Sequence, residues 1–192
     1  LADGSILKSN PDFTAFVPKY DRNDWGYLSL NHESGGLQGG VTVFDLKFNH
    51  DTKTWDMEYG LPVDFSGTGG ISKPCSGAIT PWGTVISGEE SILNSDLDSN
   101  GYYDAGWLIE SRPAERQFVQ KIWKAGNAFH ENCAIASDQK TLYWGADDYS
   151  RGFVFKYVAT QRRQLQTGKL YVLVRDDSTS STATWVQVPN TT

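Results

Sequence analysis

The chain has 192 residues and a net charge of −6, and it contains no block of like charges. This charge argues against nucleic-acid binding, which needs a basic face, and no apolar run reaches the roughly 18 residues of a membrane span. Aromatic residues make up 13 % of the chain, nineteen residues are glycine, and long runs of helix formers are few. The composition therefore predicts an all-β protein, and the length allows one good core or at most two small domains.

Short β-prone segments alternate with turns from the start of the chain. The first four predicted strands are 13–17, 26–30, 39–48 and 54–58. Together they indicate a four-stranded antiparallel meander, the unit of a propeller blade. A glycine-rich loop at 66–73 follows and separates this unit from the next.

Two further units repeat this alternation. The second has predicted strands near 77–79, 84–87, 106–110 and 118–123, and the third near 129–136, 141–145, 152–158 and 169–175. A last segment, 185–188, closes the chain or begins another blade. We predict one β-propeller-like domain with units at about 12–60, 75–125 and 129–176. Because a ring takes about four to eight blades, we expect either part of a longer protein or closure by self-assembly.

The stretch 75–90 places a thiol, a rigid turn and two carboxylates close together: Cys-Ser-Gly-Ala-Ile-Thr-Pro-Trp-Gly-Thr-Val-Ile-Ser-Gly-Glu-Glu. Its residues 84–87 form a predicted strand that Gly88 ends. Glu89 and Glu90 are then expected at the end of a strand, where a sheet presents site residues. The alternative is a polar turn that follows a buried strand.

The two cysteines, Cys75 and Cys133, allow two interpretations. A secreted protein would often pair them, and the long loop closed by this disulfide would make the bond stabilising. The alternative for Cys75 is a metal thiolate, which must be unpaired and deprotonated. The two interpretations exclude each other, and the sequence leaves both open.

An acidic loop follows the Glu-Glu pair. It offers oxygen ligands at positions one, three, five and nine of an EF-hand-type pattern: Asp96, Asp98, Asn100 and Asp104. Gly101 at position six permits the sharp turn, whereas Trp107 stands at position twelve in place of a bidentate glutamate. The loop predicts a structural calcium site, and the alternative is an acidic surface turn that needs no metal.

Acidic residues also recur at the ends or beginnings of predicted strands in all three units. The candidate metal ligands among them are Glu33, Glu89, Glu90, Glu131 and Asp148. If they point into one central channel, their repulsion requires cations, and a Cys75 thiolate would add a soft ligand suited to iron or zinc. Taken separately, each is explained as a surface carboxylate. Arg151 follows the acidic pair Asp147 and Asp148, and it either binds phosphate through a forked pair of hydrogen bonds or forms a salt bridge to one of these aspartates.

These residues resemble the signature of PhoX-type alkaline phosphatases. That pattern is a cysteine followed by small residues, then Thr-Pro-Trp-Gly-Thr and a Glu-Glu pair, as in 75–90. The Asn-His-Glu at 31–33, the Gly-Gly-Val at 39–41, the His-Glu at 130–131 and the segment 142–157 agree with the family in the same order. The resemblance spans nearly the whole chain.

The resemblance implies an exported β-propeller, periplasmic or extracellular, that hydrolyses phosphate esters with a mixed iron and calcium cluster. It implies that Cys75 is a thiolate bridging two irons and that the candidate carboxylates are ligands in the same channel. Family members are much longer, so about half of the propeller is expected to lie outside this chain. The competing hypothesis is a non-catalytic extracellular calcium-binding β-protein that assembles through open sheet edges. A metal-dependent lactonase or phosphotriesterase is a third, weaker hypothesis.

Overall fold

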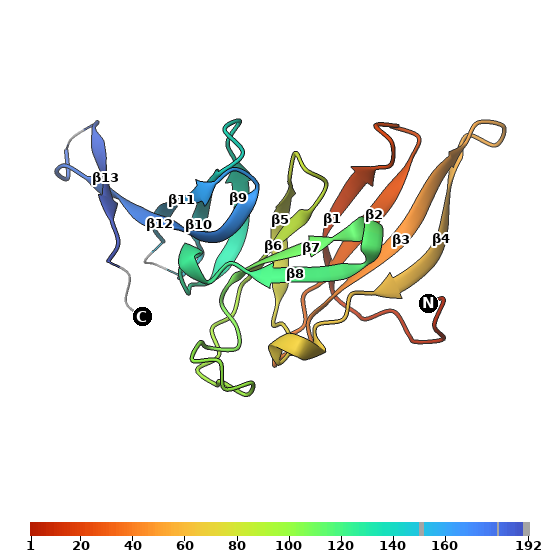
Figure 1. Cartoon of the computed structure of the whole chain (residues 1–192), viewed down its shortest axis with the longest axis horizontal. Coiled ribbons are helices and arrows are strands. Elements are labelled where there is room, and N and C mark those ends of the chain that lie inside the picture. The colour runs from red at the N-terminus through yellow and green to blue at the C-terminus, as the bar shows by residue number, and fades with distance from the viewer. Residues whose placement is uncertain (150–151, 180, 190–192) are drawn as a thin grey trace.

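The computed structural model describes residues 1–149, 152–179 and 181–189, and nearly all regular structure in them is β-strand. Figure 1 shows three antiparallel sheets side by side. The first contains β1 (Pro11–Pro18), β2 (Trp25–His32), β3 (Gly40–Asn49) and β4 (Thr54–Pro62). The second contains β5 (Pro74–Ile79), β6 (Val85–Glu89), β7 (Leu108–Arg112) and β8 (Gln117–Lys121). The prediction of an all-β chain built from four-stranded antiparallel sheets is confirmed.

The third sheet has five strands. They are β9 (His130–Ile135), β10 (Thr141–Ala146), β11 (Val154–Gln161), β12 (Gln164–Arg175) and β13 (Ala183–Gln187). The predicted segment at 185–188 is therefore the edge of this sheet and not the start of another, because β12 is long enough for β13 to pair along its end. Short 3₁₀ turns lie at Ser66–Thr68, Pro113–Glu115 and Trp123–Ala125. Among the described residues, no helix has the length and hydrophobicity to cross a membrane.

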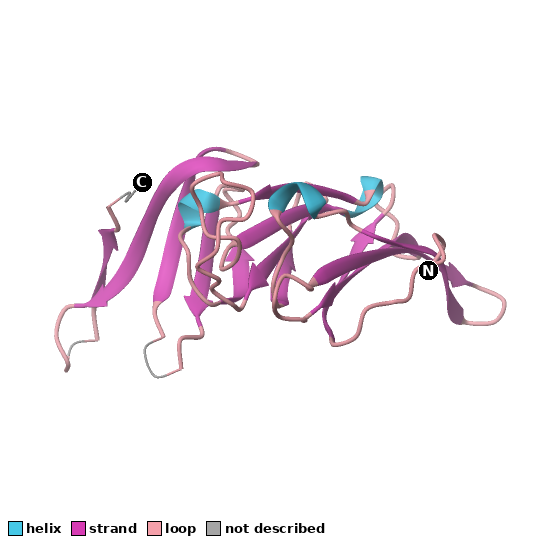
Figure 2. Cartoon of the chain, turned by 90° about the horizontal axis from the view of Figure 1, so that it is seen from below, coloured by secondary structure: helices cyan, strands magenta, loops and turns pink. Residues whose placement is uncertain are grey.

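The first strands of the three sheets are neighbours, since β5 packs against both β1 and β9. Figure 2 shows the same side-by-side arrangement from below. Alternating side chains of the strands fill the spaces between sheets. Val43, Ile71 and Ile109 belong to one buried cluster, while Leu108 and Leu142 belong to another. This packing brings the ends of strands that are far apart in sequence close together.

Gly88 does not end its strand as expected, because β6 continues to Glu89. A Cβ atom at this glycine would lie 2.6 Å from the carbonyl oxygen of His130 and 2.9 Å from that of Glu131. The missing side chain thus lets β6 approach β9 closely. As a result Glu89 lies inside the strand and Glu90 lies directly beyond it.

Candidate functional site

Three ligand atoms from two sheets meet at the ends of the first strands. One carboxylate oxygen of Asp12, one of Glu33 and the Sγ atom of Cys75 all lie within 4.8 Å of one another. Asp12 lies in β1, Glu33 follows β2, and Cys75 lies in β5. Oxygen and sulfur donors at this separation can bind one cation together.

The strand register explains how Asp12 reaches Glu33. Pro11 pairs with His32, and the backbone N–H of Glu33 donates to the carbonyl oxygen of Asn10 at 2.8 Å. Sequence reasoning missed Asp12 because it started the first strand at residue 13. The available signal was the antiparallel pairing itself, which puts the beginning of one strand beside the end of the next.

Glu90 and Asp147 extend this group. The pKa of Glu90 is raised by burial and then by the charge of Glu33, and a hydrogen bond with the Asp147 side chain raises it further. Burial raises the pKa of Cys75 to about 12, with added contributions from Asp12, Glu90 and Glu33. Both net shifts oppose ionisation, although the charge of Lys73 acts in the opposite direction on Glu90. We call the five residues Asp12, Glu33, Cys75, Glu90 and Asp147 the inner-strand cluster.

The donor set of the inner-strand cluster fits metal cations. Carboxylates suit hard ions such as calcium, and a thiolate suits iron. Cys75 and Cys133 are both free in the structure, so the disulfide interpretation is excluded. Cys133 lies in the buried core between the second and third sheets. The thiol next to the carboxylates is therefore available as a ligand.

Glu89 does not join its neighbour Glu90, which contradicts the expectation that the two act as a pair. Successive residues of a strand point to opposite faces. The Glu89 carboxylate accepts hydrogen bonds from the backbone N–H groups of Ser72 at 2.8 Å, Gly106 at 3.1 Å and Trp107 at 3.2 Å. Lys121 Nζ lies 3.6 Å from Glu89 Oε2, and both side chains are fully buried. Glu89 therefore binds two backbone segments, one at Ser72 and one at Gly106 and Trp107, to its own strand.

Lys121 completes this buried arrangement. Its ammonium donates to the carbonyl oxygen of Gly70 at 3.1 Å and to that of Asp104. Burial raises the pKa of Glu89 and lowers the pKa of Lys121, and it outweighs their mutual attraction in both. The pair fixes the segment that leads into β5 and the turn that leads into β7.

The remaining candidates take different positions. Glu131 is exposed on β9, and Asp148 is half-buried after β10. Asp147, the residue before Asp148, acts on the carboxyl group of Glu90 and raises its pKa. Arg151 lies outside the described residues.

The two buried histidines are bound within the protein. His32 Nε2 lies 2.8 Å from Thr42 Oγ1, and His130 Nε2 lies 2.9 Å from the carbonyl oxygen of Gly126. Both side chains are fully buried. His32 is the last residue of β2 and His130 is the first residue of β9, so their buried rings support these strand ends from inside the protein. Neither histidine belongs to a group of possible metal ligands among the described residues.

The acidic loop forms a second group. Ligand oxygens of Asp96, Asp98 and Asp104 lie within 4.8 Å of one another. Asp96 accepts the backbone N–H groups of Asn100 and Gly101, at 2.9 and 3.0 Å. The Asn100 side chain donates to Asp98 and accepts from the backbone N–H of Tyr102. We call the four residues Asp96, Asp98, Asn100 and Asp104 the loop cluster.

The loop cluster departs from the EF-hand geometry at its end. The chain continues into β7 and not into a helix, and Trp107 at position twelve is buried. The indole nitrogen of Trp107 donates to the carbonyl oxygen of Tyr103 at 2.7 Å. Trp107 thus anchors the loop to the second sheet.

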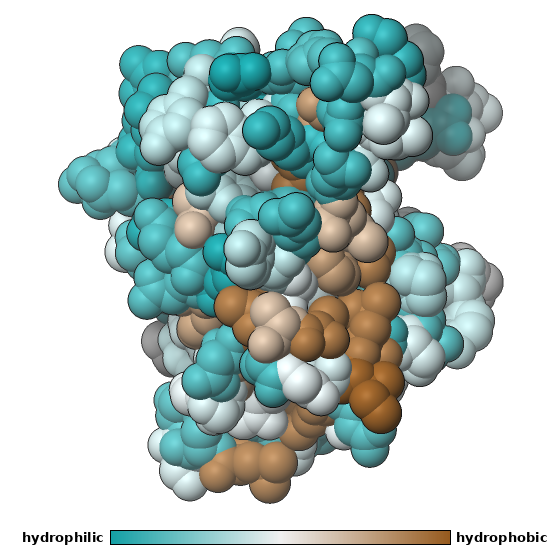
Figure 3. Space-filling view, turned by 90° about the vertical axis from the view of Figure 1, so that its right-hand side faces the viewer, coloured by the Kyte–Doolittle hydropathy of each residue, from teal (hydrophilic) through white to brown (hydrophobic). Residues whose placement is uncertain are grey.

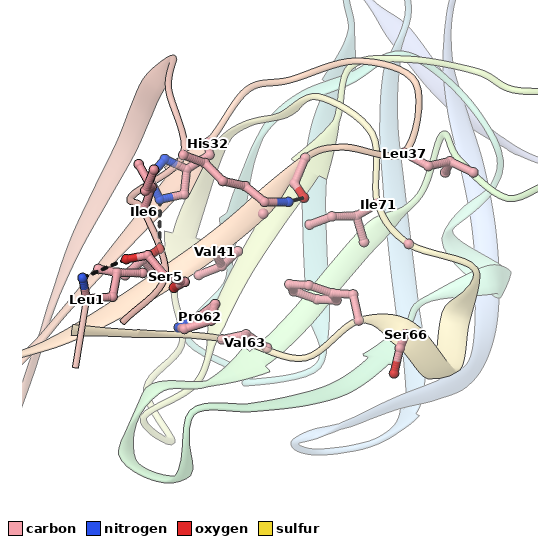
Figure 4. Close-up of a pocket in the computed structure, with 16 residues that line it drawn as sticks. Leu1, Ser5, Ile6, His32, Leu37, Val41, Pro62, Val63, Ser66 and Ile71 are labelled. Carbon is pink, nitrogen blue, oxygen red and sulfur yellow. Dashed lines mark hydrogen bonds between the residues drawn. The ribbon is translucent and has the colours of Figure 1, made fainter. Parts of the chain in front are cut away.

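Two cavities lie away from the inner-strand cluster. One, of about 320 Å³, lies beneath the N-terminal segment and is lined mainly by apolar side chains, with His32 at its edge (Figure 4). The other, of about 600 Å³, is lined by aromatic residues that include Trp107, Trp123 and Trp144. None of the five cluster residues lines either cavity.

Comparison with known proteins places these features in a family. The model of the family "Alkaline phosphatase PhoX" matches residues 61–192. Among solved structures, Pseudomonas fluorescens PhoX in complex with vanadate, a transition state analogue, is similar with a TM-score of 0.71 at 16 % sequence identity. The match covers 94 % of this chain and 49 % of that chain, so this chain spans about half of the solved protein. No curated protein matches the chain.

The structural match shows the same propeller-like fold, because it covers nearly all of this chain. The matched residues 61–192 include Cys75, Glu90 and Asp147, whereas Asp12 and Glu33 precede them. The family match confirms the resemblance that residues 75–90 indicate.

Proposed function

The chain belongs to the alkaline phosphatase PhoX family, and we propose that it carries part of the active site of a metal-dependent phosphomonoesterase. The convergence of Asp12, Glu33 and Cys75 is the observation that carries this proposal. Glu90 and Asp147 lie beside them and add acidic groups. The substrate class is a phosphate ester, and the location is the periplasm or the outside of the cell.

We assign the inner-strand cluster to iron and calcium together. Cys75 is the thiolate ligand of iron, and the surrounding carboxylates are ligands of either cation. Cations bound there would supply the positive charge that stabilises phosphate oxygens as charge develops in the transition state. Glu131 and Asp148 remain candidate ligands, and Arg151, which lies outside the described residues, remains a candidate phosphate contact. The loop cluster is assigned to calcium in a structural role.

The chain's own groups prepare this site. While no cation is bound, burial and the charge of Glu33 raise the pKa of Glu90 above its ordinary value. The Cys75 thiol is neutral in the same state, since its pKa is about 12. Cation binding must therefore release protons, and it should strengthen as pH rises.

The first test compares two cysteines that are equally buried. Cys75 is 8 % exposed and Cys133 is 7 % exposed, but only Cys75 lies in the inner-strand cluster. We expect Cys75→Ala to lose iron and to lower p-nitrophenyl phosphate hydrolysis at least about 100-fold, since removing even an indirect ligand contact costs 10–100-fold. Cys133→Ala should keep both.

Metal content is measured by mass spectrometry on the same samples, so that binding and activity are read separately. Vanadate, which binds the similar Pseudomonas fluorescens protein, should inhibit the wild-type chain. Equal activity and equal iron content in the two variants would show that Cys75 is not a ligand of the site. Iron bound without phosphatase activity would leave the metal assignment standing and reject the reaction.

A second candidate function is calcium-stabilised assembly without catalysis. Strand β4 is the open edge of the first sheet, and its Trp55, Met57 and Tyr59 are exposed. Figure 3 shows hydrophobic surface gathered on this side of the molecule. Unpaired edges accept further strands, from a second copy or from the remaining blades of a longer protein. Calcium without iron or activity, together with a regular oligomer by light scattering, would favour this function.

A further inference from the structure

Lys73 lies between the two strand ends that supply Glu33 and Glu90. Its backbone N–H donates to the carbonyl oxygen of Ser34, and its carbonyl oxygen accepts from the N–H of Glu90, both at 2.9 Å. The backbone φ angle of Lys73 is +45°, in a region that residues other than glycine rarely adopt. The two hydrogen bonds hold this unfavourable conformation in place. The position of Lys73 relative to the inner-strand cluster is therefore fixed by the fold.

The Lys73 ammonium is close to the cluster but weakly engaged. Lys73 Nζ lies 4.0 Å from Glu33 Oε1, a distance too long for a hydrogen bond. The Lys73 side chain is 46 % exposed. Its charge also acts on Glu90, whose pKa it lowers against the effect of burial. No hydrogen bond joins this ammonium to any other residue in the described part of the chain. Its donors remain available to an anion.

Two other lysines show the contrast. Lys8 Nζ donates to the carbonyl oxygens of Gln38 at 2.8 Å and Gly39 at 2.7 Å. Lys121 is buried and bound to Glu89 and two carbonyl oxygens. The ammonium groups of Lys8 and Lys121 therefore already have partners within the protein. Lys73 instead stands at the rim of the cluster with solvent on one side.

We propose that Lys73 binds the phosphoryl group of the substrate and the inorganic phosphate product, by donating from its ammonium to a non-bridging oxygen. This inference rests on the proposed phosphatase function and adds a residue that contacts the reacting group. An ammonium is a compact, rotatable donor whose hydrogen bonds to phosphate are charge-assisted. The weak ion pair with Glu33 costs little to open.

The test uses inorganic phosphate as the probe and Lys73→Met as the variant. On the metal-loaded chain, isothermal titration calorimetry should show phosphate binding weakened at least about tenfold, as expected for one lost charge-assisted hydrogen bond. KM for p-nitrophenyl phosphate should rise in parallel. Metal content should stay at the wild-type level, and Lys73→Arg should retain most phosphate affinity.

Lys53→Met is the matched control. Lys53 also has a positive φ, +59°, and it lies in the β3–β4 turn, at the other end of β3 from the residues that pair with His32. Its replacement removes one positive charge and should change neither phosphate nor metal binding. Unchanged phosphate affinity in Lys73→Met would overturn the inference. A parallel loss of metal would also overturn it, because Lys73 would then position ligands. Absence of metal and phosphate binding in the wild type would instead reject the proposed function.

Discussion

The inner-strand cluster and the loop cluster both gather acidic side chains, but they satisfy them in opposite ways. In the loop cluster the carboxylates accept backbone N–H groups of their own loop, such as those of Asn100 and Gly101 on Asp96. In the inner-strand cluster, no described residue donates a hydrogen bond to Asp12. Burial and like charges there raise the pKa values of Cys75 and Glu90.

This difference supports our proposal that the inner-strand cluster depends on a bound cation more than the loop cluster does. Backbone N–H groups offset part of the negative charge of the loop cluster, so this loop can hold its shape without metal. The inner-strand cluster has the weak ion pair between Lys73 and Glu33 in place of such bonds. Its geometry comes from the packing of three sheets, and a bound cation would reduce the repulsion among its carboxylates.

Breaking the connection between the two clusters should have the largest effect. Lys121 donates to the carbonyl oxygen of Asp104 in the loop cluster and pairs with Glu89, which precedes Glu90 of the inner-strand cluster. Lys121→Met leaves Glu89 buried without its partner, so we expect the free energy of unfolding to fall by about 3–5 kcal/mol. Urea denaturation measures it.

Two further variants isolate the charge. The double variant Glu89→Gln with Lys121→Met should recover a large part of the loss, because no buried charge remains unpaired. Lys124→Met, in the adjacent 3₁₀ turn, should change stability by no more than about 0.5 kcal/mol. A loss below about 1 kcal/mol in Lys121→Met would contradict the role given to this pair.

Lowering the pH should reduce the free energy of unfolding through His130, which supports the inner-strand cluster. Burial lowers the pKa of His130 to about 4, well below its ordinary value of 6.5. The folded state therefore keeps the imidazole neutral while the unfolded chain takes up a proton, so the stabilising contribution is complete above pH 6.5 and is lost as pH falls toward 4. The full effect is roughly 3 kcal/mol.

The measurement compares wild type with His130→Gln by urea denaturation across this pH range. Their difference in unfolding free energy should shrink as pH falls, whereas other groups affect both proteins alike. The exposed His50, which pairs with Asp24, gives the control His50→Gln. A pH-independent difference for His130→Gln would show that folding does not lower the pKa of His130.

The sequence predicted the loop cluster better than the inner-strand cluster because the loop motif is local. Asp96, Asp98 and Asp104 are brought together by one turn of nine residues, and their spacing alone indicates it. Asp12 meets Glu33 through strand register and Cys75 through sheet packing. The order of residue types along the chain reveals neither of these two contacts.

The Glu-Glu pair at the end of β6 also shows what the sequence alone could not predict. Sequence alone placed Glu89 and Glu90 in one role, but alternation of side chains sends them to opposite faces. The partner that decides the role of Glu89 is Lys121, thirty-two positions further on in the neighbouring part of the sheet. The strand positions themselves were predictable, since β-branched and aromatic segments between glycine-rich turns identify them.

The smallest effect separates the two clusters most directly. In metal-free protein, Asp96→Asn should lower the free energy of unfolding by about 1 kcal/mol, because a charged acceptor of two backbone N–H groups is lost. Asp12→Asn should leave it unchanged or raise it by up to about 0.5 kcal/mol, since it removes a charge from beside Glu33. Asp12→Asn should also lower the pKa of Cys75, seen as faster alkylation of the thiol at alkaline pH. Equal destabilisation by the two variants would mean that Asp12 is already neutralised within the fold, and the contrast between the clusters would fail.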